Sequence, residues 1–228
     1  FFGKPCGLLD QMTSSVGSFV EIDFADPANP VIEKLDFDFA SCGYALCIVD
    51  TGGSHSDLTD EYAAVRKEME SVAEYLGKSV LREVDEDEFM KNIADIRSSC
   101  GDRAVLRAMH FYGDNARVEK QAAALKAGDF ETFKKYIIES GRSSYMYNQN
   151  VYSCKKASEQ PVSLALSLSE KLLDGCGAWR VHGGGFAGTI QAFVPLNKLD
   201  EYKDLMEKVF GSGSCYILSV RPVGGVEL

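Results

Sequence analysis

The feature that most constrains the fold is a glycine cluster between two apolar runs that alternate with polar residues. It reads Trp179-Arg-Val-His-Gly-Gly-Gly-Phe-Ala-Gly188 and continues directly into Thr-Ile-Gln-Ala-Phe-Val. Glycine adopts backbone angles that are closed to other residues and lets another group approach the main chain closely. The cluster therefore predicts either a tight turn between two strands or a place where a ligand meets bare backbone.

The surrounding pattern predicts an α+β fold built on an antiparallel sheet. Four apolar, strand-like runs are separated by helical segments of period 3.6. The expected strands cover 44–49, 178–182, 188–194 and 215–221, and the expected helices between them include 160–173 and 198–210. This order favours a ferredoxin-like sheet with helices on one face. The run at 44–49 is almost wholly apolar, which indicates a central strand buried on both faces.

The rest of the chain predicts a more helical region and a short N-terminal unit. Further helices are expected at 6–16, 59–76, 85–98, 102–126 and 129–140, and further strands at 18–24 and 31–39. Residues 141–158 are polar and poorly periodic, so we expect a loop there.

Charge and cysteine content narrow the possible partners. The formal net charge of −10 argues against nucleic acid or an anionic membrane as the main partner, because both need a basic surface. No apolar run reaches membrane-spanning length. Seven scattered cysteines without a C-x-x-C pair favour reduced thiols in the cytoplasm, and the three histidines do not join them at zinc-ligand spacing. We therefore expect no metal site of this kind.

Four segments carry distinctive combinations of residues: Gly3-Lys-Pro-Cys-Gly-Leu-Leu-Asp-Gln11, Glu61-Tyr62, Arg107-x-x-His110-x-x-x-Asp114-Asn115-x-Arg117-Val118, and Arg180-Val-His-Gly-Gly-Gly-Phe-Ala-Gly188. They resemble the motifs of galactokinases, which belong to the superfamily of galactokinase, homoserine kinase, mevalonate kinase and phosphomevalonate kinase. The first resembles the motif around the catalytic aspartate, the second a sugar-contacting Glu-Tyr pair, the third a helical His…Glu-Asn-x-Arg-Val signature, and the fourth the superfamily's third motif. They occur in the family's order and span most of the chain.

The resemblance covers only the C-terminal half of a galactokinase. It implies that residues 1–40 are a remnant of the N-terminal kinase domain and that residues 41–228 form the C-terminal domain. The chain starts at Phe1 without a methionine, so we expect a piece of a longer protein. Alone it should be inactive, because half a site cannot position two substrates.

The resemblance also implies roles for particular residues. Asp10 would be the catalytic base that accepts the sugar hydroxyl's proton. Tyr62 would contact the sugar, and Gly183, Gly184 and Gly185 would bind the cofactor, ATP. Mg²⁺ and most of the ATP site would belong to the other half. Taken without the resemblance, the same residues are an ordinary helix-start carboxylate, a half-buried tyrosine and a plain β-turn.

Departures from the family pattern leave alternatives open. His182 stands where threonine is usual, and Ser140-Gly-Arg-Ser-Ser-Tyr145 replaces a more charged stretch. The substrate could be a related monosaccharide or sugar derivative, or the protein could be a non-catalytic sensor of sugar and ATP. His182 is interpreted as a turn histidine with both ring nitrogens satisfied, His55 as exposed, and His110 as part of a structural polar network with Arg107, Asn115 and Arg117. Trp179, Cys176 and Cys215 are expected in the core, and the oligomeric state is not predicted.

Overall fold

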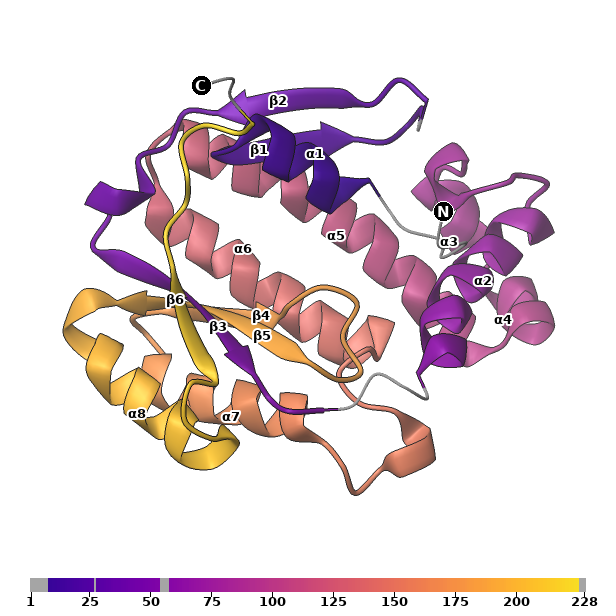
Figure 1. Cartoon of the computed structure of the whole chain (residues 1–228). Helices are drawn as coiled ribbons and strands as arrows, with labels where there is room; N and C mark the ends of the chain where they lie inside the picture. The colour runs from indigo at the N-terminus through magenta and orange to yellow at the C-terminus, as the bar shows by residue number, and fades with distance from the viewer. Residues whose placement is uncertain (1–7, 27, 54–57, 226–228) are drawn as a thin grey trace.

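A four-stranded antiparallel sheet forms the centre of the computed structural model, which describes residues 8–26, 28–53 and 58–225. Its strands are β3 (Tyr44–Asp50), β4 (Ala178–Val181), β5 (Thr189–Pro195) and β6 (Cys215–Leu218), in the spatial order β4-β5-β3-β6 (Figure 1). All three pairings are antiparallel. With α7 (Pro161–Leu173) before β4 and α8 (Leu199–Phe210) before β6, this is the predicted ferredoxin-like arrangement.

The strands form here because their side chains alternate between two apolar layers. Ala45, Cys47 and Val49 of β3 point into a core shared with α7 and α8. Tyr44 and Leu46 point to the opposite face. The run is therefore central, as predicted, and its alternation follows from the period of two that a strand imposes.

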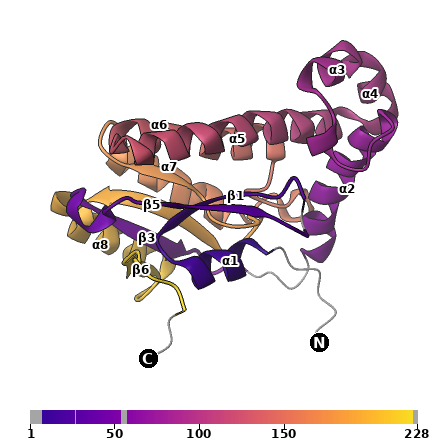
Figure 2. The ribbon, with the colours of Figure 1, turned by 90° about the horizontal axis from the view of Figure 1, so that it is seen from above.

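Helices cover both faces of the sheet, so the prediction of helices on one face was wrong. The second face packs on α5 (Asp102–Lys126) and α6 (Phe130–Ser143), which run side by side as a layer in Figure 2. Phe193 of β5 lies against Phe130 and Phe133 of α6, with ring centroids 5.7 and 5.4 Å apart. Burying these rings requires a second helical layer, because aromatic side chains contribute large apolar areas.

A separate hairpin, β1 (Phe19–Asp23) and β2 (Val31–Leu35), lies beside α1 (Leu9–Val16). In the part of the chain that the structure describes, its strands pair only with each other. Phe19 joins the hairpin to the second core through edge-on contacts with Phe39 and Phe133. The second predicted strand of this region, 31–39, ends at Leu35, because Asp38 accepts a hydrogen bond from the Ala40 amide and starts a short 3-10 helix.

Three helices gather at one end of the molecule: α2 (Thr59–Tyr75), α3 (Glu86–Lys91) and α4 (Ile93–Cys100) (Figure 1). The predicted single helix 85–98 is broken at Asn92, whose side-chain amide donates to the carbonyl of Glu88. Among the described residues, no helix is both long enough and apolar enough to span a bilayer.

The segment 141–158 is more ordered than the loop predicted from its polarity. Helix α6 continues to Ser143, and Ser144–Asn148 form a π-helix that ends at Gln149, with a φ of 56°. Serines of this segment bond to neighbouring helices rather than to water: Ser143 lies 2.9 Å from His110 Nδ1 on α5, and Ser153 donates to Glu61 on α2 at 2.8 Å. Polar residues that bond to each other inside the protein have no apolar period, which is why the pattern failed here.

Candidate functional site

The glycine cluster forms the turn between β4 and β5. Gly183 and Gly185 have φ angles of 67° and 79°, which only glycine adopts without strain. Gly183 and Gly184 are exposed, whereas Gly185 and Phe186 are buried. The turn therefore presents one bare face to solvent and packs the other against the protein.

Two residues distant in sequence hold the buried side of this turn. The Asn150 carbonyl accepts a hydrogen bond from the Phe186 amide at 2.5 Å, and the Asn150 side-chain amide donates to the Gly184 carbonyl at 3.2 Å. The Tyr62 hydroxyl donates to the Gly185 carbonyl at 2.8 Å. The turn is thus fixed by the segment after the π-helix and by the start of α2.

Side chains at two of the glycines would collide with these partners. A Cβ on Gly185 would lie 1.8 Å from the Asn150 carbonyl oxygen, and one on Gly184 would lie 2.7 Å from the Tyr62 ring. The glycine cluster predicts that some group approaches its bare backbone closely. On the buried side of the turn, Asn150 and Tyr62 of the same chain are those groups.

Three successive backbone amides lie in the turn, those of Gly183, Gly184 and Gly185. Within the described residues, the N–H groups of Gly183, Gly184 and Gly185 donate to no acceptor, whereas those of Phe186 and Ala187 do. Successive amides in a turn can form a concavity that binds anions. The exposed face of the turn is chemically suited to a phosphate oxygen.

Tyr62 lies in the first turn of α2, with its ring edge-on to Phe186 at 5.5 Å between centroids. Burial raises the pKa of the Tyr62 phenol above its usual value. Its neighbour Glu61 is buried and accepts a hydrogen bond from Ser153 at 2.8 Å. Because the phenol proton is directed at Gly185, a sugar hydroxyl would have to donate to the phenol oxygen. The sugar-contacting role stays a prediction.

Asp10 lies in the first turn of α1, exposed to solvent. Its neighbours Leu8 and Leu9 are also exposed, at 44% and 54%. Helix α1 is held at its other end, where the Ser18 amide donates to the Arg221 carbonyl at 2.7 Å. No described cavity contains both Asp10 and the glycine turn. The structure thus places the carboxylate on an open surface, and its catalytic role stays a prediction.

The helical signature forms a structural network, as predicted. Arg107 is fully buried, and its guanidinium bonds to Glu68 at 2.8 Å and to the Asn148 carbonyl at 3.1 Å. His110 is buried beside Ser143, and desolvation lowers its pKa. Arg117 pairs with Asp114 at 3.1 Å. Of the residues expected in this network, Asn115 is exposed, and its side chain makes no hydrogen bond to the residues that the structure describes.

The other histidines and cysteines follow the predictions only in part. His182 is exposed, and one ring nitrogen lies 3.1 Å from Gln191, so only one nitrogen has a partner among the described residues. His55 and the first motif's residues 3–7 lie outside the described residues. Trp179 and Cys215 are core residues, and Cys176 is only partly buried.

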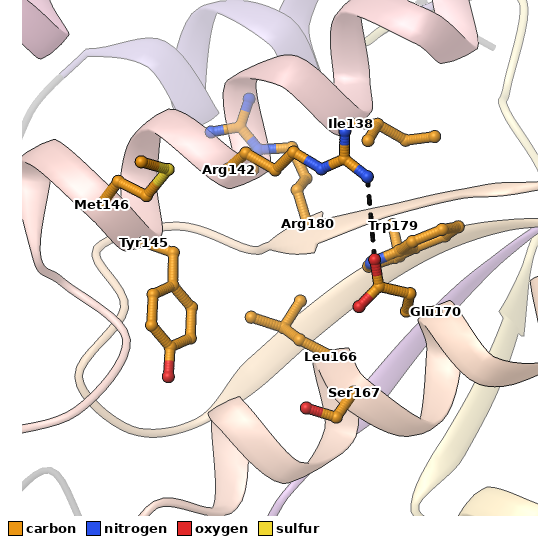
Figure 3. A pocket seen from close by; sticks show the side chains of 10 residues that line it. Ile138, Arg142, Tyr145, Met146, Leu166, Ser167, Glu170, Trp179 and Arg180 are labelled. Atoms are coloured by element: carbon orange, nitrogen blue, oxygen red, sulfur yellow. Dashed lines mark ion pairs between the residues drawn. The ribbon is translucent and has the colours of Figure 1, made fainter. Parts of the chain in front are cut away.

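A cavity of about 310 Å³ lies elsewhere, between α6, α7 and the edge strand β4 (Figure 3). Arg142 and Glu170 form an ion pair of 3.7 Å beside it, and Trp179, Leu166 and Tyr145 line it. A second cavity of about 170 Å³ borders Glu61 and Phe186 behind the glycine turn. Neither includes Asp10, Tyr62 or the three glycines. In the described residues, no cluster of three or more His, Cys, Asp or Glu could hold a metal ion.

Comparison with known proteins identifies relatives over nearly the whole chain. Galactokinase from Actinobacillus pleuropneumoniae is 26% identical over 206 residues, and human galactokinase is 30% identical over all 228. The chain is similar to galactokinases over nearly its whole length. It spans about half the length of the curated relatives it matches, 51% and 55% of these two. No family model matches it.

The fold of this chain is also found in solved structures. The crystal structure of Lactococcus lactis galactokinase complexed with galactose superposes with a TM-score of 0.71 at 20% identity, covering 99% of this chain and 57% of the other. These findings confirm the resemblance predicted from the four motifs and the α+β fold class.

One residue of the site was missed by the sequence analysis. Asn150 lies in the polar segment interpreted as a loop, 34 residues before its partner Gly184. Neither its spacing nor its neighbours carry a signal that connects it to the glycine cluster.

Proposed function

We propose that this chain is the C-terminal part of an enzyme that transfers the γ-phosphate of ATP to the 1-hydroxyl of galactose or a close relative of it. The observation that carries the proposal is the similarity of the entire chain to human galactokinase, with 30% identity over 228 residues. The four motifs in family order support it independently of overall identity. The similar Lactococcus lactis galactokinase was crystallised with galactose, which is a sugar of the proposed substrate class.

In this proposal three elements of the chain act on the two substrates. Asp10 accepts the proton of the sugar hydroxyl as the phosphoryl group arrives. The amides of Gly183, Gly184 and Gly185 donate to phosphate oxygens of ATP. Tyr62 accepts a hydrogen bond from the sugar. Bound Mg²⁺ would neutralise phosphate charge, and its ligands would come from outside the described residues, which offer no cluster for it.

The exposure of Asp10 fits a chain that works with a further segment. A catalytic carboxylate needs to be held against its substrate, because positioning supplies most of phosphoryl-transfer catalysis. We therefore retain the division into residues 1–40, which belong with the N-terminal kinase domain, and residues 41–228, which form the C-terminal domain. The isolated 228 residues should have no kinase activity.

The test compares the chain alone with the chain extended by the segment encoded upstream of Phe1. ADP release is measured with ATP and a panel of sugars that includes galactose. We expect galactose-dependent turnover only in the extended protein, and its loss in Asp10→Asn with an unchanged circular dichroism spectrum. The matched control, Asp204→Asn, removes an exposed carboxylate on α8 and should keep full activity.

Each of the other possible outcomes would contradict a different part of the proposal. Turnover by the isolated chain would contradict its incompleteness. Near-normal turnover of Asp10→Asn would remove the proposed base. Preference for another sugar would select the alternative kinase, and binding of sugar and ATP without turnover would select the sensor.

A further inference from the structure

We propose that Asn150 is a positioning residue that fixes the peptide between Gly184 and Gly185, and with it the direction of the Gly185 amide. The geometry of the turn carries this inference. That this amide meets an anion, and that the anion is a nucleotide phosphate, rests on the proposed function.

Asn150 is hydrogen-bonded to two successive peptide units of the turn. Its side-chain amide nitrogen donates to the Gly184 carbonyl at 3.2 Å, and its own carbonyl accepts from the Phe186 amide at 2.5 Å. The residue is only 4% exposed, so water competes little for either bond. Asn150 directly follows Gln149, whose left-handed backbone ends the π-helix and turns the chain toward the glycines.

The direction of one peptide unit follows from these contacts. In a planar trans peptide, the carbonyl of one residue and the amide of the next point in opposite directions. Because the Gly184 carbonyl points at Asn150, the Gly185 amide points away from Asn150. The bond from Asn150 Nδ2 thus directs the Gly185 amide to the side of the turn where no described acceptor lies.

Glycines on both sides make this peptide easy to flip without such a bond. Neither Gly184 nor Gly185 has a Cβ to restrict rotation, so the peptide could turn by half a revolution at little steric cost. A flip would point the Gly184 carbonyl where the Gly185 amide had been and present an acceptor, not a donor, to an anion.

The side-chain amide nitrogen of Asn150 is the atom that holds this peptide in its observed direction. The side-chain oxygen of Asn150 is buried and has no hydrogen-bond partner in the described structure. An aspartate in its place would keep oxygens and lose the donor. It would also set a negative charge against the Gly184 carbonyl. Asn150→Asp should therefore be at least as harmful as Asn150→Ala.

The test uses both variants with Asn148→Ala as a matched control. Asn148 is also a buried asparagine of the π-helix segment, but its carbonyl accepts from Arg107 and it does not contact the turn in the described structure. The Gly185 and Phe186 amides are followed by ¹H–¹⁵N NMR in the 228-residue chain. KM for ATP, KM for sugar and kcat are measured in the extended protein.

We expect both Asn150 variants to shift or split the Gly185 amide signal, and Asn148→Ala to leave it unchanged. KM for ATP should rise about tenfold, as for one lost hydrogen bond, with KM for sugar and kcat within about twofold. Unchanged amide signals would overturn the positioning role. Shifted signals with an unchanged KM for ATP would overturn the link to the nucleotide. A wild-type protein without sugar-dependent turnover would instead contradict the proposed function, and the NMR result would still decide the role of Asn150.

Discussion

Replacing single glycines of the β4–β5 turn by alanine separates backbone strain from collision. Gly183 and Gly185 both have a positive φ, so alanine at either position costs about 1–2 kcal/mol of strain. A Cβ at Gly183 would meet nothing within 4 Å, whereas one at Gly185 would lie 1.8 Å from the Asn150 carbonyl oxygen. The two substitutions therefore differ only in what surrounds the added methyl group.

The collision at Gly185 has a magnitude that follows from the contacts it breaks. Moving Asn150 away would remove its bonds to Gly184 and Phe186, at about 1 kcal/mol each. Gly185→Ala should thus lower the free energy of unfolding by about 3–4 kcal/mol, against about 1–2 kcal/mol for Gly183→Ala. For a chain of this length, these values correspond to losses in Tm of about 10 °C and about 4 °C.

Urea unfolding, followed by the fluorescence of the single tryptophan, measures this difference. Trp179 lies in the core beside α7, so its emission reports global unfolding. The m-values of both variants should match the wild type, which would show that only stability has changed. If Gly185→Ala proves no more destabilising than Gly183→Ala, the turn is not packed closely against the Asn150 carbonyl.

Three further results are expected from the interior of the helical region and the thiols. Arg107→Ala should lower the free energy of unfolding in urea by about 3–5 kcal/mol, because it removes a fully buried side chain together with its bonds to Glu68 and the Asn148 carbonyl; a loss below 1 kcal/mol would contradict this. Burial holds the pKa of His110 below the usual 6.5, so the unfolded chain takes up a proton first and stability falls as pH drops through that value. His110→Gln should flatten this dependence between pH 7.5 and 5.5, and an unchanged slope would speak against it. Among the described thiols, alkylation followed by peptide mapping should modify exposed Cys154 well before buried Cys47, and equal rates would show that the core opens.

The sheet was predictable because its chemistry is periodic. The strand expected at 44–49 is Tyr44–Asp50, and the helix expected at 160–173 is Pro161–Leu173. Apolar side chains that alternate toward two cores leave this trace in the sequence. The second helical layer was not predictable in the same way, since Phe130 and Phe193 are brought together only by the fold.

The segment 141–158 was misinterpreted as a loop because its polar side chains have partners inside the protein. Ser143 bonds to His110 on α5, and Ser153 donates to Glu61 on α2. The sequence alone does not distinguish a polar residue that is buried and hydrogen-bonded from the same residue in an exposed loop. Burial of this kind can be recognised only when the partner is known.

The contacts of the glycine turn change how mutations in it must be interpreted. Gly184 is packed on the Tyr62 ring and Gly185 on Asn150, so any larger residue there would disturb the protein even if no ligand touched the turn. A raised KM for ATP in Gly184→Val would therefore not distinguish a nucleotide contact from a displaced Tyr62. Asn150 offers a cleaner test, because its side chain acts from the buried side and can be shortened without placing an atom on the exposed face. An effect of Asn150→Ala on the KM for ATP that spares the KM for the sugar is the result expected if Asn150 acts through the direction of the Gly185 amide.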